Sequence, residues 1–273
     1  MDVLVIGATG KSGRPVVDAL VARGAKVRAA SRTPGAAAPG AEPVRFDWDD
    51  RSTWRPALEG AEGLYVVGPV RQSEPELLMH QLLDDADGIR RVVLLSVLGA
   101  DRLPSLVPMA GWEHDLRMSG REWTVLRPNW FQQNFGEGFA GPLRERGVLE
   151  LPAGEAALSF VDTRDVGEVA AVALTSGGHG GQVYELTGPS ALTHGEALSA
   201  LGRADGRDLR YVPQEPAAFA AALRGRGVAE RSVEWQLALF RLMREGGNAV
   251  VTSTVREVTG RPARSFLAYA EGA

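Results

Sequence analysis

Residues 3–13 read Val3-Leu4-Val5-Ile6-Gly7-Ala8-Thr9-Gly10-Lys11-Ser12-Gly13, and they decide the fold of the first half of the chain. Four consecutive apolar residues are typical of a strand that is buried on both faces. Three glycines follow at the spacing G-x-x-G-x-x-G, and apolar residues then recur at helical spacing over residues 14–23, with Pro15 in the first turn. The pattern predicts a buried strand joined to a helix by a tight glycine turn.

Each glycine of this turn has a physical reason in a nucleotide-binding site. Gly7 allows the tight turn, Gly10 lets the backbone approach a diphosphate, and Gly13 permits close contact between helix and strand. The free N–H groups and the dipole at the helix N-terminus favour an anion there. The alternative is a tight turn that binds nothing. The residues we expect to bind the cofactor here are Gly7, Thr9, Gly10, Lys11, Ser12 and Gly13.

The residue after the second expected strand, residues 26–30, is informative about the kind of dinucleotide. An NAD-selective site has an acidic residue at this point to hold the ribose hydroxyls, whereas an arginine accommodates a 2′-phosphate. Here the acid is missing and Arg32 is present, which favours NADP(H) over NAD(H), although Arg32 can also be an ordinary solvated arginine. Asp47, Gly68 and Pro69 follow the next two expected strands and are positioned to flank adenine and ribose, or to serve as ordinary loop residues.

Outward from the glycine turn, short apolar runs alternate with amphipathic stretches as far as residue 127. Strands that alternate with helices imply parallel pairing through right-handed crossovers. We therefore predict an α/β fold of the Rossmann type, a doubly wound parallel sheet with a smaller C-terminal lobe covering the substrate. Residues 1–128 form the expected NAD(P)-binding domain. Residues 129–273 form the expected substrate-binding portion, interleaved with the first.

Composition excludes several classes of function. The net charge is −4 with both signs interspersed, which argues against a nucleic-acid partner. Cysteine is absent, so disulfides and thiolate metal sites are excluded, and the four histidines lack metal-ligand spacing. No apolar stretch approaches the length of a membrane span. We expect a cytoplasmic protein, a monomer or homodimer, with a small-molecule substrate and no metal.

The chain resembles the NmrA-like branch of the atypical short-chain dehydrogenase/reductases. The likeness is carried by the glycine turn, by Leu126-Arg127-Pro128-Asn129-Trp130-Phe131, by residues 162–166 and by Thr259-Gly260-Arg261-Pro262. Within that branch it is similar to the festuclavine dehydrogenase type and the NADPH quinone reductase type. The resemblance implies reduction of an iminium, an enone or a quinone by NADPH. The branch also contains NADP-binding proteins that regulate transcription partners without turnover.

A catalytic acid is hard to identify. The superfamily's Tyr-x-x-x-Lys pair is absent, because the only lysines are Lys11 and Lys26 and neither lies four residues after a tyrosine. Hydride addition to an iminium needs no protein acid, so positioning and water exclusion can suffice. For a ketone, enone or quinone, the candidate proton donors are His114 and Ser96. A surface or packing role for His114 and a turn role for Ser96 are the alternatives.

A loop after the last strong strand of the first half is expected to line the substrate pocket. Its candidate pocket residues are Asn129, Trp130, Phe131 and Asn134, unless the aromatic side chains form core instead. Further along the chain, Asp162 is expected to cap a helix.

Three functions remain open from the sequence. The first is an NADPH-dependent reductase of a small, apolar, electron-poor substrate. The second is a non-catalytic NADP(H) sensor of the NmrA type. The third is a non-redox enzyme that retains the fold.

Overall fold

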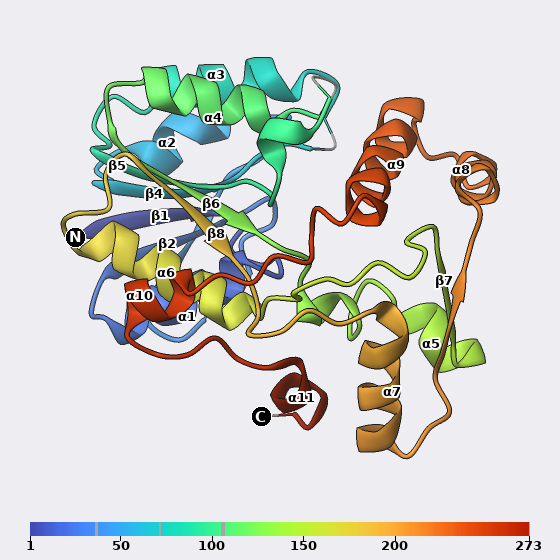
Figure 1. Ribbon diagram of the computed structural model, residues 1–273. Helices are drawn as coiled ribbons and strands as arrows, with labels where there is room; N and C mark the ends of the chain where they lie inside the picture. Colours follow the sequence, from blue (N-terminus) through green and yellow to red (C-terminus); the bar gives the residue numbers. More distant parts are fainter. Residues whose placement is uncertain (36–37, 71, 105–106, 273) are drawn as a thin grey trace.

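Seven parallel strands form the central sheet of the computed structural model, in the order β3-β2-β1-β4-β5-β6-β8 (Figure 1). The structure describes residues 1–35, 38–70, 72–104 and 107–272. The strands are β1 (Asp2–Ile6), β2 (Lys26–Ser31), β3 (Ala41–Arg45), β4 (Gly63–Val67), β5 (Arg91–Leu95), β6 (Glu122–Pro128) and β8 (Gln182–Leu186). The order reverses at β1, which pairs with both β2 and β4. Ligands of such sheets bind at the carboxyl ends of the strands beside this reversal.

Helices cover both faces of the sheet (Figure 1). On one face lie α2 (Trp54–Leu58), α3 (Pro75–Asp85) and α4 (Met109–Met118). On the other lie α1 (Gly13–Ala22), α6 (Thr163–Thr175) and α10 (Thr254–Thr259). The prediction of a doubly wound sheet is confirmed.

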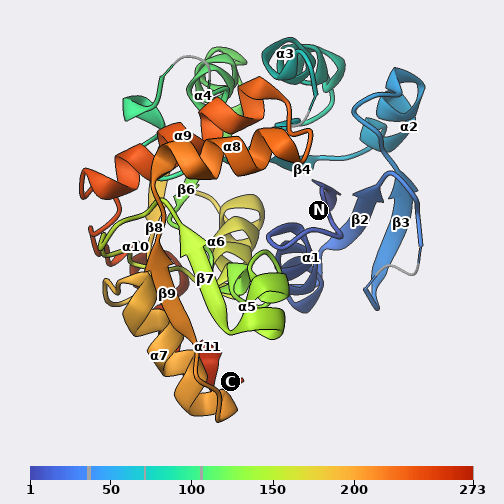
Figure 2. The same ribbon diagram turned by 90° about the vertical axis from the view of Figure 1, so that its right-hand side faces the viewer.

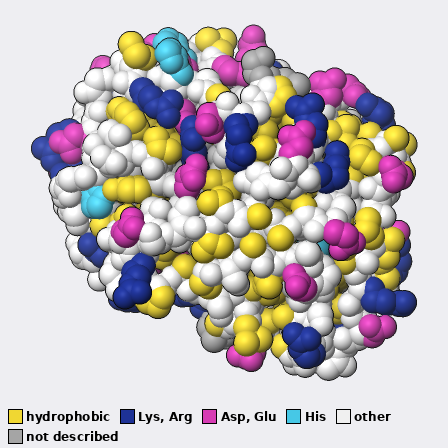
Figure 3. Space-filling view, in the orientation of Figure 1, with side chains coloured by type: hydrophobic (Ala, Val, Ile, Leu, Met, Phe, Trp, Pro, Cys, Tyr) yellow, Lys and Arg dark blue, Asp and Glu magenta, His cyan; other side chains and the backbone are white. Residues whose placement is uncertain are grey.

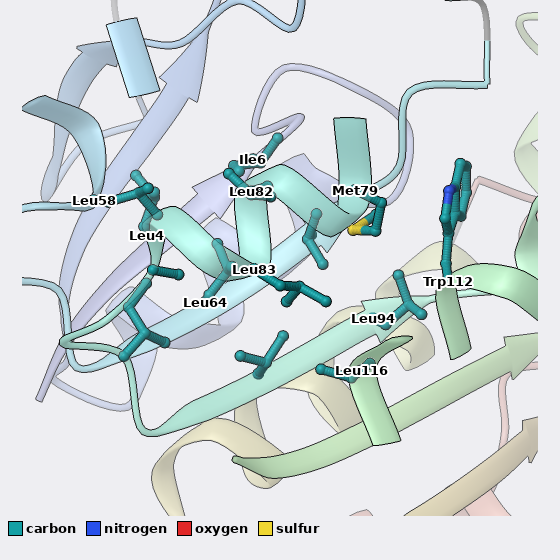
Figure 4. Packing of buried hydrophobic residues seen from close by; sticks show 14 of the residues in the cluster. Leu4, Ile6, Leu58, Leu64, Met79, Leu82, Leu83, Leu94, Trp112 and Leu116 are labelled. Carbon is teal, nitrogen blue, oxygen red and sulfur yellow. The ribbon is translucent and has the colours of Figure 1, made fainter. Parts of the chain in front are cut away.

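The alternation of side chains along β1 explains why both faces are covered. Leu4 and Ile6 pack with α3 on one face, and Val3 and Val5 pack with α1 on the other. Figure 4 shows Leu4 and Ile6 among the leucines of α3, including Leu82. Each fully buried side chain of this size contributes about 1.5–3 kcal/mol of transfer free energy, so a strand apolar on both faces is stable only between two helical layers.

The second half of the chain contributes to two parts of the molecule, the main sheet with its helices and a separate lobe. Its segments β8, α6 and α10 return to the main sheet, where β8 pairs with β6. The remaining segments form a lobe with its own apolar core beside the carboxyl ends of the strands (Figure 2). They are α5 (Ala140–Arg146), β7 (Val148–Leu151), α7 (His194–Asp205), β9 (Arg210–Pro213), α8 (Pro216–Gly225), α9 (Glu230–Arg244) and α11 (Phe266–Ala270). In the lobe β7 pairs with β9 in parallel.

Several lobe elements lie outside the sequence prediction, among them α5, β7, β9 and α11. Each is four to seven residues long, too short for hydrophobic periodicity to reveal it.

Figure 3 shows acidic and basic side chains mixed over one face of the molecule. Within the described ranges, no helix combines the length and apolarity needed to cross a membrane.

Candidate functional site

The glycine turn between β1 and α1 has a backbone that two of its glycines alone permit. Gly7 has a φ of +82°, in the left-handed region that L side chains rarely adopt. A Cβ atom on Gly13 would lie 2.1 Å from the carbonyl oxygen of Gly7. Any side chain at residue 13 would therefore push α1 away from β1.

This turn presents free donors to the carboxyl end of the sheet. Among the hydrogen bonds of the described residues, the N–H groups of Thr9, Lys11 and Ser12 donate to no backbone carbonyl. Ser12 is the N-cap of α1, and its side chain makes no capping hydrogen bond. Free N–H groups at the positive end of a helix dipole form an anion cradle, so this turn fits the diphosphate of a dinucleotide.

A cavity of about 270 Å³ lies beside this turn, against β2 and α1. It is lined by Ala8, Thr9, Arg14, Val17, Asp18, Ala29, Ser31, Gly35, Ala38 and Pro43. Arg32 is exposed just after β2 and is not part of this lining. Arg14, which we did not predict, lines the cavity. A cation in the first turn of a helix opposes the helix dipole unless an anion compensates it, and this signal was available in the sequence.

The residues after β3 and β4 have local structural roles. The backbone carbonyl of Asp47 accepts a hydrogen bond from Trp54 Nε1 at 2.7 Å, and its carboxylate accepts from the N–H of Asp49 at 3.2 Å. Gly68 lies under the Trp112 ring, where a Cβ atom would come within 2.2 Å of a ring carbon. Pro69 is buried beside it. Their position at the carboxyl edge of the sheet is as expected, and packing accounts for Gly68 without a ligand.

Lys11 joins the glycine turn to the loop after β6. Its ammonium donates a hydrogen bond to Asn134 Oδ1 at 2.8 Å. Burial lowers the pKa of the Lys11 ammonium, and the negative charge of Glu137 offsets this only in part. Two residues predicted for different ligands, Lys11 for the cofactor and Asn134 for the substrate, are therefore in direct contact.

An aromatic pocket of about 450 Å³ opens in the lobe next to this contact. It is lined by Trp130, Gly138, Phe139, Pro142, Arg146, Leu149, Glu150, Leu151, Gln214, Phe219, Ala222, Leu223, Arg226, Gln236, Leu239 and Phe240. The rings of Trp130 and Phe240 are 5.2 Å apart. A Cβ atom on Gly138 would lie 3.3 Å from Lys11 Nζ. The pocket thus borders the glycine turn through Gly138.

The four predicted pocket residues have different surroundings. Trp130 lines the aromatic pocket. Asn129 is buried and bonded within the protein, donating to Ser159 Oγ at 2.7 Å and to the Asn248 carbonyl at 2.8 Å. Phe131 packs against the sheet core on the α1 and α6 side. Asn134 contacts Lys11, as described above.

Ser96, at the end of β5, belongs to a buried ionic network. Its hydroxyl donates a hydrogen bond to Glu113 Oε1 at 2.6 Å. Arg127 donates two hydrogen bonds to the same carboxylate, at 2.9 and 2.7 Å, and Arg117 donates another at 2.8 Å. Burial raises the pKa of Glu113, but these hydrogen bonds outweigh it and hold the pKa below its ordinary value.

His114 follows Glu113 on α4 but is exposed. No hydrogen bond between His114 and Ser96 occurs among the described residues, and the partner of Ser96 is Glu113 instead. The two candidate proton donors are therefore not joined. Glu113 itself is absent from the sequence prediction, because nothing in a helical Trp-Glu-His run signals a buried carboxylate.

The predicted cap of α6 is confirmed. The side chain of Asp162 accepts a hydrogen bond from the N–H of Arg164 at 2.7 Å. Gln133 donates to the same carboxylate at 3.0 Å, which fixes the loop after β6 against α6. Asp162 therefore also helps to hold in place the loop after β6, which contains the pocket residue Trp130.

Comparison with known proteins shows which family this chain belongs to. Residues 7–176 match the family described as NAD(P)H-binding. The NAD(P)H azoreductase of Xenophilus azovorans is 33% identical over 98% of this chain and 96% of its own length. The agroclavine dehydrogenase of Claviceps fusiformis is 28% identical over 82% of this chain and 81% of its own.

Solved structures of other proteins have the same fold as this chain. The NADPH-dependent quinone oxidoreductase of Escherichia coli, crystallised with NADPH, superposes with a TM-score of 0.82 at 25% identity, over all of this chain and 99% of its own. The negative transcriptional regulator NmrA superposes with a TM-score of 0.75 at 17% identity, over 99% and 94% of the two chains, and shows the fold alone. The expected resemblance to NAD(P)H-binding reductases is confirmed, and the NmrA superposition agrees with the expected fold.

Proposed function

This chain belongs to the NAD(P)H-binding family, and on that premise we propose that it is an NADPH-dependent reductase of the NmrA-like branch. It transfers hydride to a small, largely apolar, electron-poor substrate of the iminium, enone or quinone class. It does so without a Tyr-x-x-x-Lys pair, which the sequence lacks.

One observation carries this proposal: an anion cradle and an aromatic pocket meet at a single contact. The free N–H groups of the glycine turn fit a diphosphate. The Lys11–Asn134 hydrogen bond joins this turn to the loop whose Gly138 lines the pocket. A dinucleotide lying on the cradle would therefore end beside a pocket that accepts a flat, apolar molecule.

We assign the cofactor to residues at the carboxyl ends of β1 to β4. A bound nicotinamide supplies a hydride donor, and the chain supplies the binding energy and the orientation. The N–H groups of residues 9, 11 and 12 hold the diphosphate, and the turn after β4 lies beside the ribose. The assigned residues are Gly7, Thr9, Gly10, Lys11, Ser12, Gly13, Arg32, Asp47, Gly68 and Pro69.

Selectivity for NADP(H) is assigned to two arginines. Arg32 follows β2, where an acid would select NAD(H). Arg14 lines the cavity beside the end of β2. Neither forms an ion pair with another described residue, so both are available to a 2′-phosphate.

Residues 129–273 are assigned to substrate binding, interleaved with residues 1–128. Trp130, Phe139 and Phe240 form apolar walls that exclude water from the reacting atoms. Asn134 holds Lys11 next to the pocket, and Asn129 accepts a hydrogen bond from the backbone N–H of Trp130 in the same loop. Ser96 is assigned a positioning role, because its proton is engaged by Glu113.

The test is oxidation of NADPH by the purified protein in the presence of quinones, enones and cyclic iminiums, one class at a time. We expect substrate-dependent loss of the NADPH absorbance with at least one class, and NADPH binding measurable by calorimetry. Binding without turnover on any class would favour the sensor instead. Product formation without net NADPH consumption would favour a non-redox enzyme.

A further inference from the structure

Lys11 lies next to Gly138, a residue that lines the aromatic pocket. Of the three N–H bonds of its ammonium, one is used by the side-chain oxygen of Asn134. Among the residues that the structure describes, none forms an ion pair with Lys11. An amide oxygen is a neutral partner, so the charge of Lys11 is not compensated at this position.

The surroundings of Lys11 increase the effect of this charge. Its ammonium is partly buried, and desolvation lowers its pKa, so it gains by meeting an anion. The negative charge that partly offsets this lowering of the Lys11 pKa is the carboxylate of Glu137, an exposed residue in the loop that contains Asn134. This carboxylate lies beyond ion-pair distance from the Lys11 ammonium. The residue of the pocket lining next to Lys11 is Gly138, which has no side chain of its own; a Cβ atom there would lie 3.3 Å from Lys11 Nζ.

We propose that Lys11 faces the substrate oxygen on which negative charge develops, and that this site therefore takes neutral conjugated carbonyl compounds, quinones or enones, rather than cationic iminiums. The inference rests on the proposed reductase function and narrows its substrate class. The aromatic walls around Trp130 and Phe240 hold the apolar body of such a substrate, and its carbonyl oxygen points toward Lys11.

The chemistry balances with NADPH as the reductant. Hydride addition to the conjugated carbon moves the π electron pair onto the carbonyl oxygen, which then takes one proton from the Lys11 ammonium. Solvent returns that proton to the lysine amine. The positive charge stabilises the oxygen anion in the transition state. An iminium is already cationic, so the same charge disfavours its binding.

The activity test uses three variants at saturating NADPH. Lys11→Gln keeps a group that can hydrogen-bond Asn134 but removes the charge and the acidic proton. We expect kcat/KM for a benzoquinone or cyclic enone to fall about 100-fold. Lys11→Arg keeps the charge, and we expect it to retain more activity than Lys11→Gln. Lys26→Gln removes the other lysine, which pairs with Asp2 on the surface, and should match the wild type.

A second measurement does not depend on turnover. Reductive methylation with ¹³C-formaldehyde labels two lysines and the N-terminus, so each lysine gives its own NMR signal. A substituted phenolate, added to the protein with NADP⁺, imitates the oxygen anion. We expect the phenolate to shift the Lys11 signal and raise its pKa, and to leave the Lys26 signal unchanged. The control is NADP⁺ alone.

The outcomes separate the two proposals. If no class of acceptor oxidises NADPH, the reductase function fails. If NADPH is oxidised but Lys11→Gln reduces quinones as fast as the wild type, or iminiums are the preferred substrates, only this inference fails. It also fails if NADP⁺ alone shifts the Lys11 signal fully and phenolate adds nothing, because Lys11 would then serve the diphosphate.

Discussion

The carboxyl ends of β5 and β6 and the carboxyl ends of β1 and β2 both carry basic residues, but their surroundings are opposite. At β6, Arg127 is held by two hydrogen bonds to the buried Glu113. At β1 and β2, Lys11 and Arg32 form no ion pair with any described residue. A cation that is paired with a buried carboxylate of the same protein stabilises the fold, whereas a cation without an ion-pair partner is available to bind an anionic ligand.

The largest effect is expected where the charges are saturated. Glu113→Ala leaves the Arg127 guanidinium, whose side chain is 11% exposed, without its buried carboxylate and with only the exposed Asp101 as an ion-pair partner among the described residues. Removing one partner of a buried ion pair costs about 3–5 kcal/mol, so we expect a loss of that size in the free energy of unfolding, measured in urea. NADP⁺ affinity should change little.

The matched control is Arg117→Ala. Arg117 bonds the same carboxylate, but its side chain is 37% exposed, and surface pairs contribute at most about 1 kcal/mol. Equal losses for the two variants would show that the network at β5 and β6 does not depend on burial.

In the lobe, His194 is a buried polar residue that has no hydrogen-bond partner within the described ranges, unlike the buried Glu113 at β5 and β6. Both ring nitrogens of His194 lack a partner among the described residues, and burial lowers the pKa of His194 to about 4. As pH falls below the ordinary value near 6.5, the unfolded chain takes up a proton that the folded chain refuses. The free energy of unfolding should therefore fall by about 3 kcal/mol between pH 6.5 and 4.

Carboxylates titrate in the same range, so the test is a difference between two proteins. His194→Phe fills the site between Phe135 and Tyr211 with an uncharged ring. Its unfolding free energy should depend less on pH than that of the wild type over this range. Parallel curves would contradict the assignment to His194.

A smaller effect, confined to ligand binding, is expected at the free cations. Arg32→Ala should raise the dissociation constant for NADPH about 10- to 100-fold, because it removes charge-assisted hydrogen bonds to the 2′-phosphate. The constant for NADH should not change, and neither should stability. Arg14→Ala, tested in parallel by calorimetry, shows whether the cavity-lining arginine shares this role. Equal weakening of NADPH and NADH binding would remove Arg32 from the 2′-phosphate site.

The smallest effect concerns Lys11 in alkaline solution. Burial lowers the pKa of Lys11 in the folded chain. Between that pKa and the unfolded value, the unfolded chain holds a proton that the folded chain has lost, so the free energy of unfolding rises with pH. Lys11→Gln should remove this rise, which we expect to be less than about 1 kcal/mol for a partly exposed group. Lys26→Gln should retain it.

Neighbouring residues in the sequence predicted the parts of the fold that depend on local rules. Alternation of apolar runs predicted the sheet, and the side-chain oxygen of Asp162 predicted the start of α6. The loop after β6 shows where such rules fail. Asn129 and Trp130 are adjacent and both resemble pocket residues, yet one is bonded inside the protein and the other lines the pocket. Which side each residue faces depends on the lobe segments that pack against the loop.

By itself, the sequence determined the alternation of strands and helices in the first half and the glycine turn, because hydrophobic period and the backbone freedom of glycine are properties of residues a few positions apart. Only the tertiary structure decided that Lys11 meets Asn134, 123 positions along the chain, and that Glu113 rather than His114 reaches Ser96. Such contacts depend on how separate elements pack in space, and no local pattern records that packing.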